Sequence, residues 1–190
     1  RSEDRIKAIS DAIMDVSKLN DPIGEIEYMK ERPSGLVIGK KRVPMGVIGM
    51  IYESRPNVTA DAFSLSLKAG SACILKGGRD AFESNFAISE IFRATLSKMG
   101  YNPDFLQLIS DNSREATHYL MKMSDYLDLL IPRCGASLIQ SVVQNATVPV
   151  IETGTGNCHI FVDETADLKR AVDIIINAKT TRPGTCNSLE

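Results

Sequence analysis

The sequence lacks the features by which membrane, secreted and nucleic-acid-binding proteins are usually known. No apolar run approaches the length of a membrane span, and the polar, amphipathic beginning is not typical of a secretory signal. A formal net charge of −2 leaves neither a basic surface for nucleic acid nor a polybasic patch for a membrane. With 43% hydrophobic and 24% charged residues, the composition is that of a soluble globular protein. We therefore expect no nucleic-acid and no membrane partner.

Closely spaced cysteine pairs are also missing. The four cysteines are far apart along the chain, and none belongs to a Cys-x-x-Cys pair: Cys73, Cys134, Cys158 and Cys186. This spacing argues against a zinc site, and 190 residues are enough to bury a core without disulfides. We expect no metal, and four free thiols in a reducing compartment, the cytoplasm.

Two elements are predicted before residue 44. Apolar residues at helical spacing predict an amphipathic surface helix over residues 4–18 with one buried stripe, formed by Ile6, Ile9, Ile13 and Val16. Residues 24–43 predict an antiparallel hairpin, because Pro33 and Gly35 suit a turn between two strand-like segments.

From Pro44 onward, strands alternate with helices. Short apolar runs predict strands over residues 47–52, 72–76, 105–109, 126–132, 148–152 and 158–162. Helical periodicity predicts helices around residues 58–69, 88–99, 113–123, 136–144 and 168–175, with Gly70 and Gly100 as stops after the first two. This alternation implies βαβ units, and therefore an α/β fold with a mostly parallel sheet, to which the hairpin is an appendage.

The chemistry is expected in the segments that follow the strands, because open parallel sheets bind ligands at the carboxyl ends of their strands. Three of these segments are rich in Gly, Arg, Asn and Ser: ESRPNVT, GGRD and RCGAS. Backbone amides and cations in such loops suit an anionic ligand such as a dinucleotide phosphate. Neither a Gly-x-Gly-x-x-Gly fingerprint nor a Walker loop is present, so the pattern alone predicts an α/β nucleotide or phosphate binder.

The last segment adds a thiol. Cys186 lies four residues after Arg182, in a loop that contains proline and glycine. A thiol in such a loop can be accessible, and a nearby cation such as Arg182 favours the nucleophilic thiolate. From these residues alone, Cys186 is explained equally well as an ordinary loop thiol and as a nucleophile.

Four longer blocks decide between these alternatives by resemblance. They are VPMGVIGMIYESRPNVTADAFSLSLKAGSACILKGGRDA, IPRCGASLI, NATVPVIETGTGNCHIFVDETADL and NAKTTRPGTCNSLE. Together they resemble the glutamate-5-phosphate reductases, a family of the aldehyde-dehydrogenase superfamily, to which YESRPNVT and the NAKT–RP–CN pattern are highly specific. The similarity runs over nearly the whole chain. It implies the aldehyde-dehydrogenase cofactor domain, a Rossmann-like parallel sheet with helices on both faces.

The resemblance implies the NADPH-dependent reduction of L-glutamate 5-phosphate to glutamate 5-semialdehyde and phosphate, a step of proline biosynthesis. Cys186 matches the family's nucleophile, whose thiolate attacks the acyl carbon, expels phosphate and leaves a thioester. Asn57 matches an oxyanion-hole amide, and Arg182 is a candidate for positioning the substrate phosphate. Glu152 lies where hydrolytic relatives keep a water-activating glutamate, a base that a reductase does not require.

The resemblance also implies where the adenosine half of the cofactor binds. Lys76 matches a lysine that contacts the ribose, and Gly77 and Gly78 follow it in the same loop. NAD-preferring relatives often carry a glutamate three residues after the lysine, where this chain has Arg79. A carboxylate repels a ribose 2′-phosphate, whereas the forked donors of Arg79 pair with it, so we expect NADPH rather than NADH.

The pyrophosphate is expected at the turn and helix N-terminus formed by Pro132, Arg133, Gly135 and Ser137. The family usually has two glycines in this turn, and Cys134 stands in the place of the first. A side chain at this position narrows the approach of a phosphate.

The expected organisation has four parts. We expect residues 1–20 to form the amphipathic helix and residues 21–43 the hairpin, which is the oligomerisation element of a homo-oligomer. Residues 44–181 are expected to form the NADP-binding domain, and residues 182–190 the start of a catalytic domain with the nucleophile loop. Family members extend beyond both ends of this chain, so we expect a fragment, and turnover by the fragment alone stays open.

Simpler interpretations of these residues also remain open. From the residues alone, Asn57 is better explained as the cap of the helix that follows it, and the resemblance puts the oxyanion role ahead. The alternatives are an ordinary strand-end lysine for Lys76, a solvated loop charge for Arg79 and a loop-closing role for Arg182. For Cys134, the open question is how its side chain affects phosphate binding.

Structural roles are expected for the remaining thiols and imidazoles. Cys73 lies in an apolar strand and is interpreted as a buried, inert thiol. Cys158 and His159 are neighbours on a predicted strand and point to opposite faces, which argues against a catalytic dyad. His118 is expected on the surface of an amphipathic helix.

Two other functions fit the sequence. The chain could be a cofactor-binding or self-associating module without turnover, or it could belong to the reductase half of a bifunctional pyrroline-5-carboxylate synthase. An assay of turnover separates the first alternative from an enzyme, and the residues that precede Arg1 decide the second.

Overall fold

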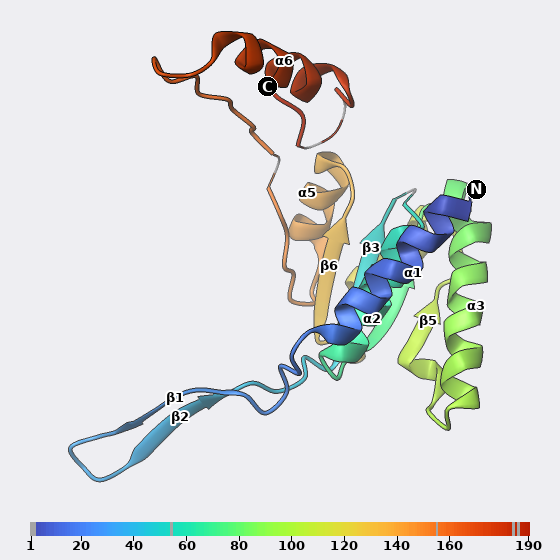
Figure 1. Cartoon of the computed structure of the whole chain (residues 1–190). Coiled ribbons are helices and arrows are strands. Elements are labelled where there is room, and N and C mark those ends of the chain that lie inside the picture. Colours follow the sequence, from blue (N-terminus) through green and yellow to red (C-terminus); the bar gives the residue numbers. More distant parts are fainter. Residues whose placement is uncertain (1–2, 54, 155, 184, 186) are drawn as a thin grey trace. The chain divides into compact units, whose positions relative to one another are not determined.

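The structure, a computed structural model, describes residues 3–53, 55–154, 156–183, 185 and 187–190 (Figure 1). The chain divides into two compact units, Arg1–Glu152 and Thr153–Glu190. The first unit contains the sheets, and the second is built around a single helix. Among the described residues, no helix is both long and apolar enough to cross a membrane.

A helix and a hairpin open the first unit, as predicted. Helix α1 spans Glu3–Lys18 and packs against α2, which spans Asn57–Lys68. Its apolar stripe is less buried than predicted: Ile6 is 59% exposed, and no described residue of α1 is fully buried. The reason is that α2 is the main neighbour of α1 among the described elements, so only one side of the stripe is covered.

The hairpin consists of β1 (Ile26–Glu31) and β2 (Val37–Lys41), which pair antiparallel in a two-stranded sheet of their own (Figure 1). The predicted turn is confirmed. The N–H of Gly35 donates to the carbonyl of Arg32, and that of Arg32 donates to the carbonyl of Leu36.

The main sheet has four strands, β3 (Val47–Tyr52), β4 (Ala72–Lys76), β5 (Leu106–Leu108) and β6 (Leu129–Arg133). Their order is β5-β4-β3-β6, and every pair is parallel, which confirms the predicted α/β fold. The connections between these strands contain α2, α3 (Phe82–Lys98), α4 (Arg114–Met121), and the short 3₁₀ helices η1 (Arg79–Ala81) and η2 (Pro103–Phe105), and α5 (Ala136–Asn145) follows β6. The predicted helix stops are also confirmed, since Gly70 and Gly100 follow α2 and α3 with φ of +68° and +80°.

Helices cover both faces of this sheet, and each face has its own core. One core joins β3 and β6 to α4 and α5 through buried residues that include Ile51, Leu120, Leu130 and Val142. The other joins β3, β4 and β5 to α2 and α3, with Phe63, Leu75, Leu96 and Leu106 among its members. Because successive residues of a strand face opposite sides, two apolar cores require strands that are apolar on both faces. Strand β3 is apolar throughout, and β4 and β6 are apolar up to their last residues, Lys76 and Arg133.

The strand predicted at residues 148–152 is not formed, and only a single parallel bridge joins Val150 to Leu130. Leu130 donates to the carbonyl of Pro149 and accepts from the N–H of Ile151. To extend this ladder in either direction, Pro149 or Pro132 would have to donate a backbone N–H, which proline lacks. The two prolines therefore limit the pairing to one bridge.

The second unit contains α6 (Leu168–Thr180), whose N-cap Asp167 accepts a hydrogen bond from the N–H of Arg170. The predicted helix is confirmed, but the strand predicted at residues 158–162 is not formed, because Cys158 alone pairs, in a single bridge with Leu189.

Candidate cofactor and active site

The sheet brings the predicted cofactor residues of three loops to one edge. The strands are parallel, so their carboxyl ends lie side by side. Lys76, at the end of β4, is in register with Ile51 of β3, and Arg133, at the end of β6, is in register with Tyr52. The loops that follow β3, β4 and β6 therefore start from the same edge.

Lys76 is a buried cation at this edge, with only 4% of its surface exposed. Its Nζ donates to the carbonyl oxygen of Gly77 at 3.3 Å. Burial lowers the pKa of Lys76, and the negative charge of Asp111, in the segment after β5, acts in the opposite direction. Asp111 itself has a lowered pKa, chiefly because its carboxylate accepts hydrogen bonds from Ser113 and, to a lesser degree, because Lys76 is near.

The residues after Lys76 form a tight turn into α3. Gly77 is buried, and Gly78 is the N-cap of η1. Arg79 is the first residue of η1 and is exposed, and its guanidinium has no hydrogen bond or ion pair among the residues that the structure describes. Arg79 is thus available for an external anion, whereas Lys76 is held inside the turn.

The turn between β6 and α5 is anchored to the end of β3. Pro132 is buried, and the predicted contacts Arg133, Gly135 and Ser137 are exposed. Gly135 is the N-cap of α5, and its N–H donates to Oε1 of Glu53 at 3.1 Å. The helix N-terminus predicted to face pyrophosphate therefore already has a carboxylate at its first amide.

Cys134 is half-buried beside this carboxylate. Burial, with the negative charge of Glu53, raises the pKa of the Cys134 thiol to about 11. The thiol therefore stays protonated near neutral pH and adds no negative charge to the turn. Its side chain is half-buried in the turn, and a protonated thiol is a poor nucleophile.

Asn57 is the first residue of α2 and is exposed. It does not cap the helix: the N-cap position is Pro56, and no side chain forms a capping hydrogen bond there. The amide Nδ2 of Asn57 instead donates to Oδ2 of Asp61, one turn further on, at 3.2 Å. The capping interpretation is therefore wrong, and the side chain lies on the surface at the start of the helix.

The predicted nucleophile, Cys186, lies outside the described residues, and its neighbours are held by α6. Ser188 is buried, and both its hydroxyl and the N–H of Leu189 donate to the carbonyl of Ala178 at 3.2 Å. The carbonyl of Arg182 accepts from the N–H and the hydroxyl of Thr185, and the Arg182 side chain is exposed. These contacts belong to the second unit and fix the two ends of the loop.

Sequence reasoning missed Glu53 and Asp111 as site residues. Both follow strands at the carboxyl edge, which is the signal by which they could have been found. The partner of Glu53 could not have been found in the same way, because Glu53 and Gly135 are 82 residues apart. The predictions for Cys73 and His118 are confirmed, since Cys73 is 1% exposed and His118 lies on the surface of α4.

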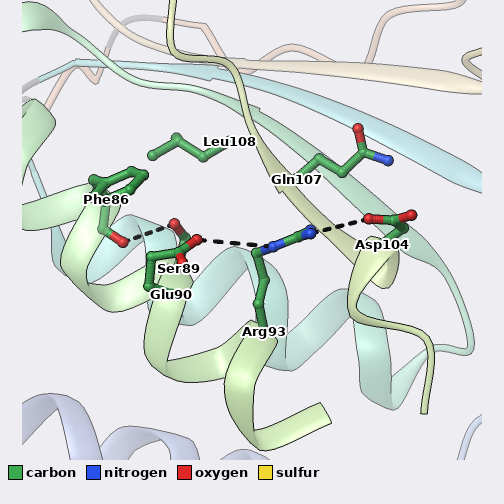
Figure 2. Close-up of a pocket in the computed structure, with 7 residues that line it drawn as sticks. All are labelled: Phe86, Ser89, Glu90, Arg93, Asp104, Gln107 and Leu108. Carbon is green, nitrogen blue, oxygen red and sulfur yellow. Dashed lines mark hydrogen bonds and ion pairs between the residues drawn. The ribbon is translucent and has the colours of Figure 1, made fainter. Parts of the chain in front are cut away.

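A cavity of about 220 Å³ lies between α3 and the edge strand β5 (Figure 2). Figure 2 shows Arg93 between Glu90 and Asp104, and the guanidinium also donates to the carbonyls of Pro103 and Leu106. The donors of Arg93 are thus used within the fold. No residue of the predicted site lines this cavity.

Comparison with known proteins identifies the family and agrees with the fold. Residues 5–189 match the sequence profile of the aldehyde dehydrogenase family. A gamma-glutamyl phosphate reductase from Lachnospira eligens is 59% identical over 186 residues, which are 98% of this chain and 45% of that protein. The chain thus spans a little under half the length of the curated relatives it matches.

Two solved structures are similar as well. The crystal structure of gamma-glutamyl phosphate reductase from Thermotoga maritima has a TM-score of 0.88 and 48% identity, covering 100% of this chain and 46% of that one. That of the Saccharomyces cerevisiae gamma-glutamyl phosphate reductase has a TM-score of 0.71 and 33% identity, over 95% of this chain and 46% of that one. The resemblance found in the four sequence blocks is confirmed.

Proposed function

Because the chain belongs to the aldehyde dehydrogenase family, we propose that it carries the cofactor-binding half of a glutamate-5-phosphate reductase. The reaction is the reduction of L-glutamate 5-phosphate to glutamate 5-semialdehyde and phosphate. One observation carries the proposal: identity to gamma-glutamyl phosphate reductases reaches 59% and extends over almost the whole chain, including the block that contains Cys186. The compartment is the cytoplasm.

The cofactor of this proposal is NADPH, and the carboxyl edge of the sheet fits it. An anionic dinucleotide needs cations and unshielded backbone amides, and this edge presents Lys76, Arg79 and Arg133 together with the N-terminus of α5. The exposed Arg79 would pair with the 2′-phosphate. Lys76 and the glycines after it would hold the ribose, for which the Lys76 Nζ would have to leave the carbonyl of Gly77 and turn outward. When bound, the cofactor supplies the hydride.

At the N-terminus of α5, a carboxylate already occupies the place proposed for the pyrophosphate. Glu53 accepts the N–H of Gly135, and a carboxylate repels a pyrophosphate. Cofactor binding at this turn would therefore require that Glu53 rotate away or that the pyrophosphate use other donors. Arg133 and Ser137, both exposed, are the donors that the turn offers.

The proposed chemistry belongs to Cys186. Its thiolate attacks the acyl carbon, and the acyl–phosphate bond breaks with the electron pair leaving on phosphate, which gives a thioester. Hydride addition to the thioester carbonyl gives a thiohemiacetal, which collapses to the aldehyde and the thiolate. Asn57 donates to the oxyanion formed at each addition, and Arg182 positions the phosphate.

The test is phosphate-dependent formation of NADPH from NADP and glutamate semialdehyde, measured by absorbance with the full-length protein. The wild type is expected to turn over, and Cys186→Ala is expected to lose turnover by about a thousandfold or more while still binding NADPH. Cys158→Ala, which removes another thiol of the same unit, is the matched control and should retain activity. Cofactor binding without any turnover by the wild type would favour the binding-module alternative.

A further inference from the structure

A chain of hydrogen bonds runs through the interior beside the cofactor turn. The hydroxyl of Tyr52 lies 2.7 Å from Oγ1 of Thr59, and that oxygen donates to Oδ1 of Asn85 at 3.2 Å. The hydroxyl hydrogen of Thr59 is used on Asn85, so Tyr52 must be the donor in the first bond. All three residues are at most 2% exposed.

The chain joins three elements that carry the proposed site. Tyr52 ends β3, and Thr59 lies in the first turn of α2, two residues after Asn57. Asn85 lies in the first turn of α3, directly after the turn that contains Lys76 and Arg79. A shift of one of these elements would therefore be transmitted to the other two.

The cofactor turn packs directly against this chain. A Cβ on Gly77 would lie 2.5 Å from Nδ2 of Asn85 and 3.2 Å from Cζ and Oη of Tyr52. Both neighbours are held by hydrogen bonds to Thr59, so they cannot move aside as a loose side chain would. Residue 77 must be glycine for the backbone to lie this close.

Asn85 is also incompletely satisfied. Its Nδ2 is buried and has no hydrogen-bond acceptor among the described residues. A buried donor without a partner destabilises a folded protein, and an apolar side chain of similar size would avoid that loss. Stability alone therefore does not explain why an amide side chain lies at this position. The hydrogen bond that its Oδ1 accepts from Thr59, together with its contact to Gly77, does explain it.

We propose that Asn85 is a positioning residue, which acts through Thr59 and Tyr52 to hold the backbone of the cofactor turn, residues 76–79, against the start of α2. The inference rests on the proposed function in one respect, namely that the nicotinamide cofactor binds at this turn. Asn85 is fully buried, so its effect would reach the cofactor through the position of Gly77.

The first test compares two substitutions of Thr59 in the full-length protein. Thr59→Val removes the hydroxyl but keeps the branched shape, and Thr59→Ser keeps the hydroxyl. Thr59→Val should raise the dissociation constant and KM for NADPH about tenfold, and Thr59→Ser should stay within about twofold of wild type. The KM for the acyl phosphate should not change in either variant. Equal NADPH affinity in the two variants would overturn the proposal.

A second test does not depend on Thr59→Val folding. Gly77→Ala should weaken NADPH binding about tenfold, and adding Asn85→Ala should recover part of this loss, because the amide that the new methyl group strikes is gone. Losses that simply add in the double variant would contradict a contact between the two residues. The urea midpoint of each variant shows that it is folded.

Amide hydrogen exchange separates this inference from the proposed function. If the wild type neither binds NADPH nor turns over, the proposed function fails, but the exchange rate at Gly77 still reports on the turn. Faster exchange in Thr59→Val than in Thr59→Ser supports the positioning role. Equal exchange, in a protein that does bind NADPH, refutes the positioning role alone.

Discussion

Lys76 and Arg79 are three residues apart, yet the fold gives them opposite environments. Lys76 is buried and donates to the backbone of its own turn, and burial lowers its pKa. Arg79 is exposed, and its guanidinium is not used within the described part of the chain. The lysine therefore shapes the turn, and the arginine is the group that can select the ligand.

Arg79→Glu should reverse the preference for the phosphorylated cofactor. A carboxylate repels the 2′-phosphate of NADPH and does not affect NADH in the same way, so NADPH affinity should fall by about a hundredfold and NADH affinity by less than about threefold. Titration of the full-length protein with both cofactors measures this. Lys98→Glu, an equal change of charge at the exposed end of α3, is the control. Equal losses for the two cofactors would remove Arg79 from this role.

The environments of the thiols also determine their reactivity. Burial raises the pKa of Cys73 to about 12, and burial with the charge of Glu53 raises that of Cys134 to about 11. Since a thiol reacts as its thiolate, both are protonated and slow near neutral pH. The proposed nucleophile, Cys186, lies outside the described residues.

Iodoacetamide should therefore label Cys186 first in the native protein at pH 8 and leave Cys73 unmodified. Labelling of Cys134 should be slow and should rise about tenfold per pH unit between pH 7 and 9, because its raised pKa lies above this window. Mass spectrometry of the digested protein measures each site, and protein unfolded in urea, in which all four thiols react, is the control. A labelling rate for Cys134 that levels off below pH 9 would disagree with its environment.

At the scale of elements, the start of β3 shows how a glycine ties two strands together. Gly46 has a φ of +98°, and its carbonyl accepts from the N–H of Ala72 at the start of β4. Asp128, just before β6, accepts the N–H of Val47 at 2.7 Å and donates its own N–H to the carbonyl of Val47. A Cβ on Gly46 would lie only 2.0 Å from Oδ2 of Asp128.

Gly46→Ala should lower the free energy of unfolding by about 2–4 kcal/mol, from the left-handed backbone and from displacement of the Asp128 carboxylate. Gly100→Ala is a matched control, because Gly100 also has a positive φ but nothing lies within 4 Å of its Cβ position. It should cost about 1 kcal/mol. Urea denaturation measures both, and equal losses would show that Asp128 adjusts without cost.

On the scale of the whole molecule, the hairpin has exposed apolar side chains on both of its strands. All residues of β1 and β2 are exposed, among them Tyr28, Met29, Val37 and Ile38. Three ion pairs, of Lys40 with Glu27 and of Arg42 with Glu25 and Glu27, add little at an exposed surface. An isolated two-stranded hairpin is marginal in water, so these apolar side chains are expected to be covered in a homo-oligomer.

Ile38→Glu should therefore shift the full-length protein towards smaller species. A charge placed at an apolar interface without a partner disfavours association. Ile91→Glu is the control, because it makes the same change at an exposed position on α3. Size-exclusion chromatography with light scattering measures the mass of both. An unchanged mass for Ile38→Glu would place the association surface elsewhere.

The sequence by itself determined the parallel sheet, the hairpin and the edge at which Lys76, Arg79 and Arg133 gather. These follow from patterns within short segments, because the period of apolar residues reports which faces are buried and parallel strands share one edge. The family motif was likewise local. It identified Cys186, which lies outside the described residues.

Only the tertiary structure decided the partners. The bond between Glu53 and Gly135, the bond between Thr59 and Asn85, and the contact of Gly46 with Asp128 join residues that are far apart in sequence. The same is true of the single bridge at Val150, which replaced a predicted strand. Such pairs depend on which elements become neighbours and in what register, and no pattern within one segment records that.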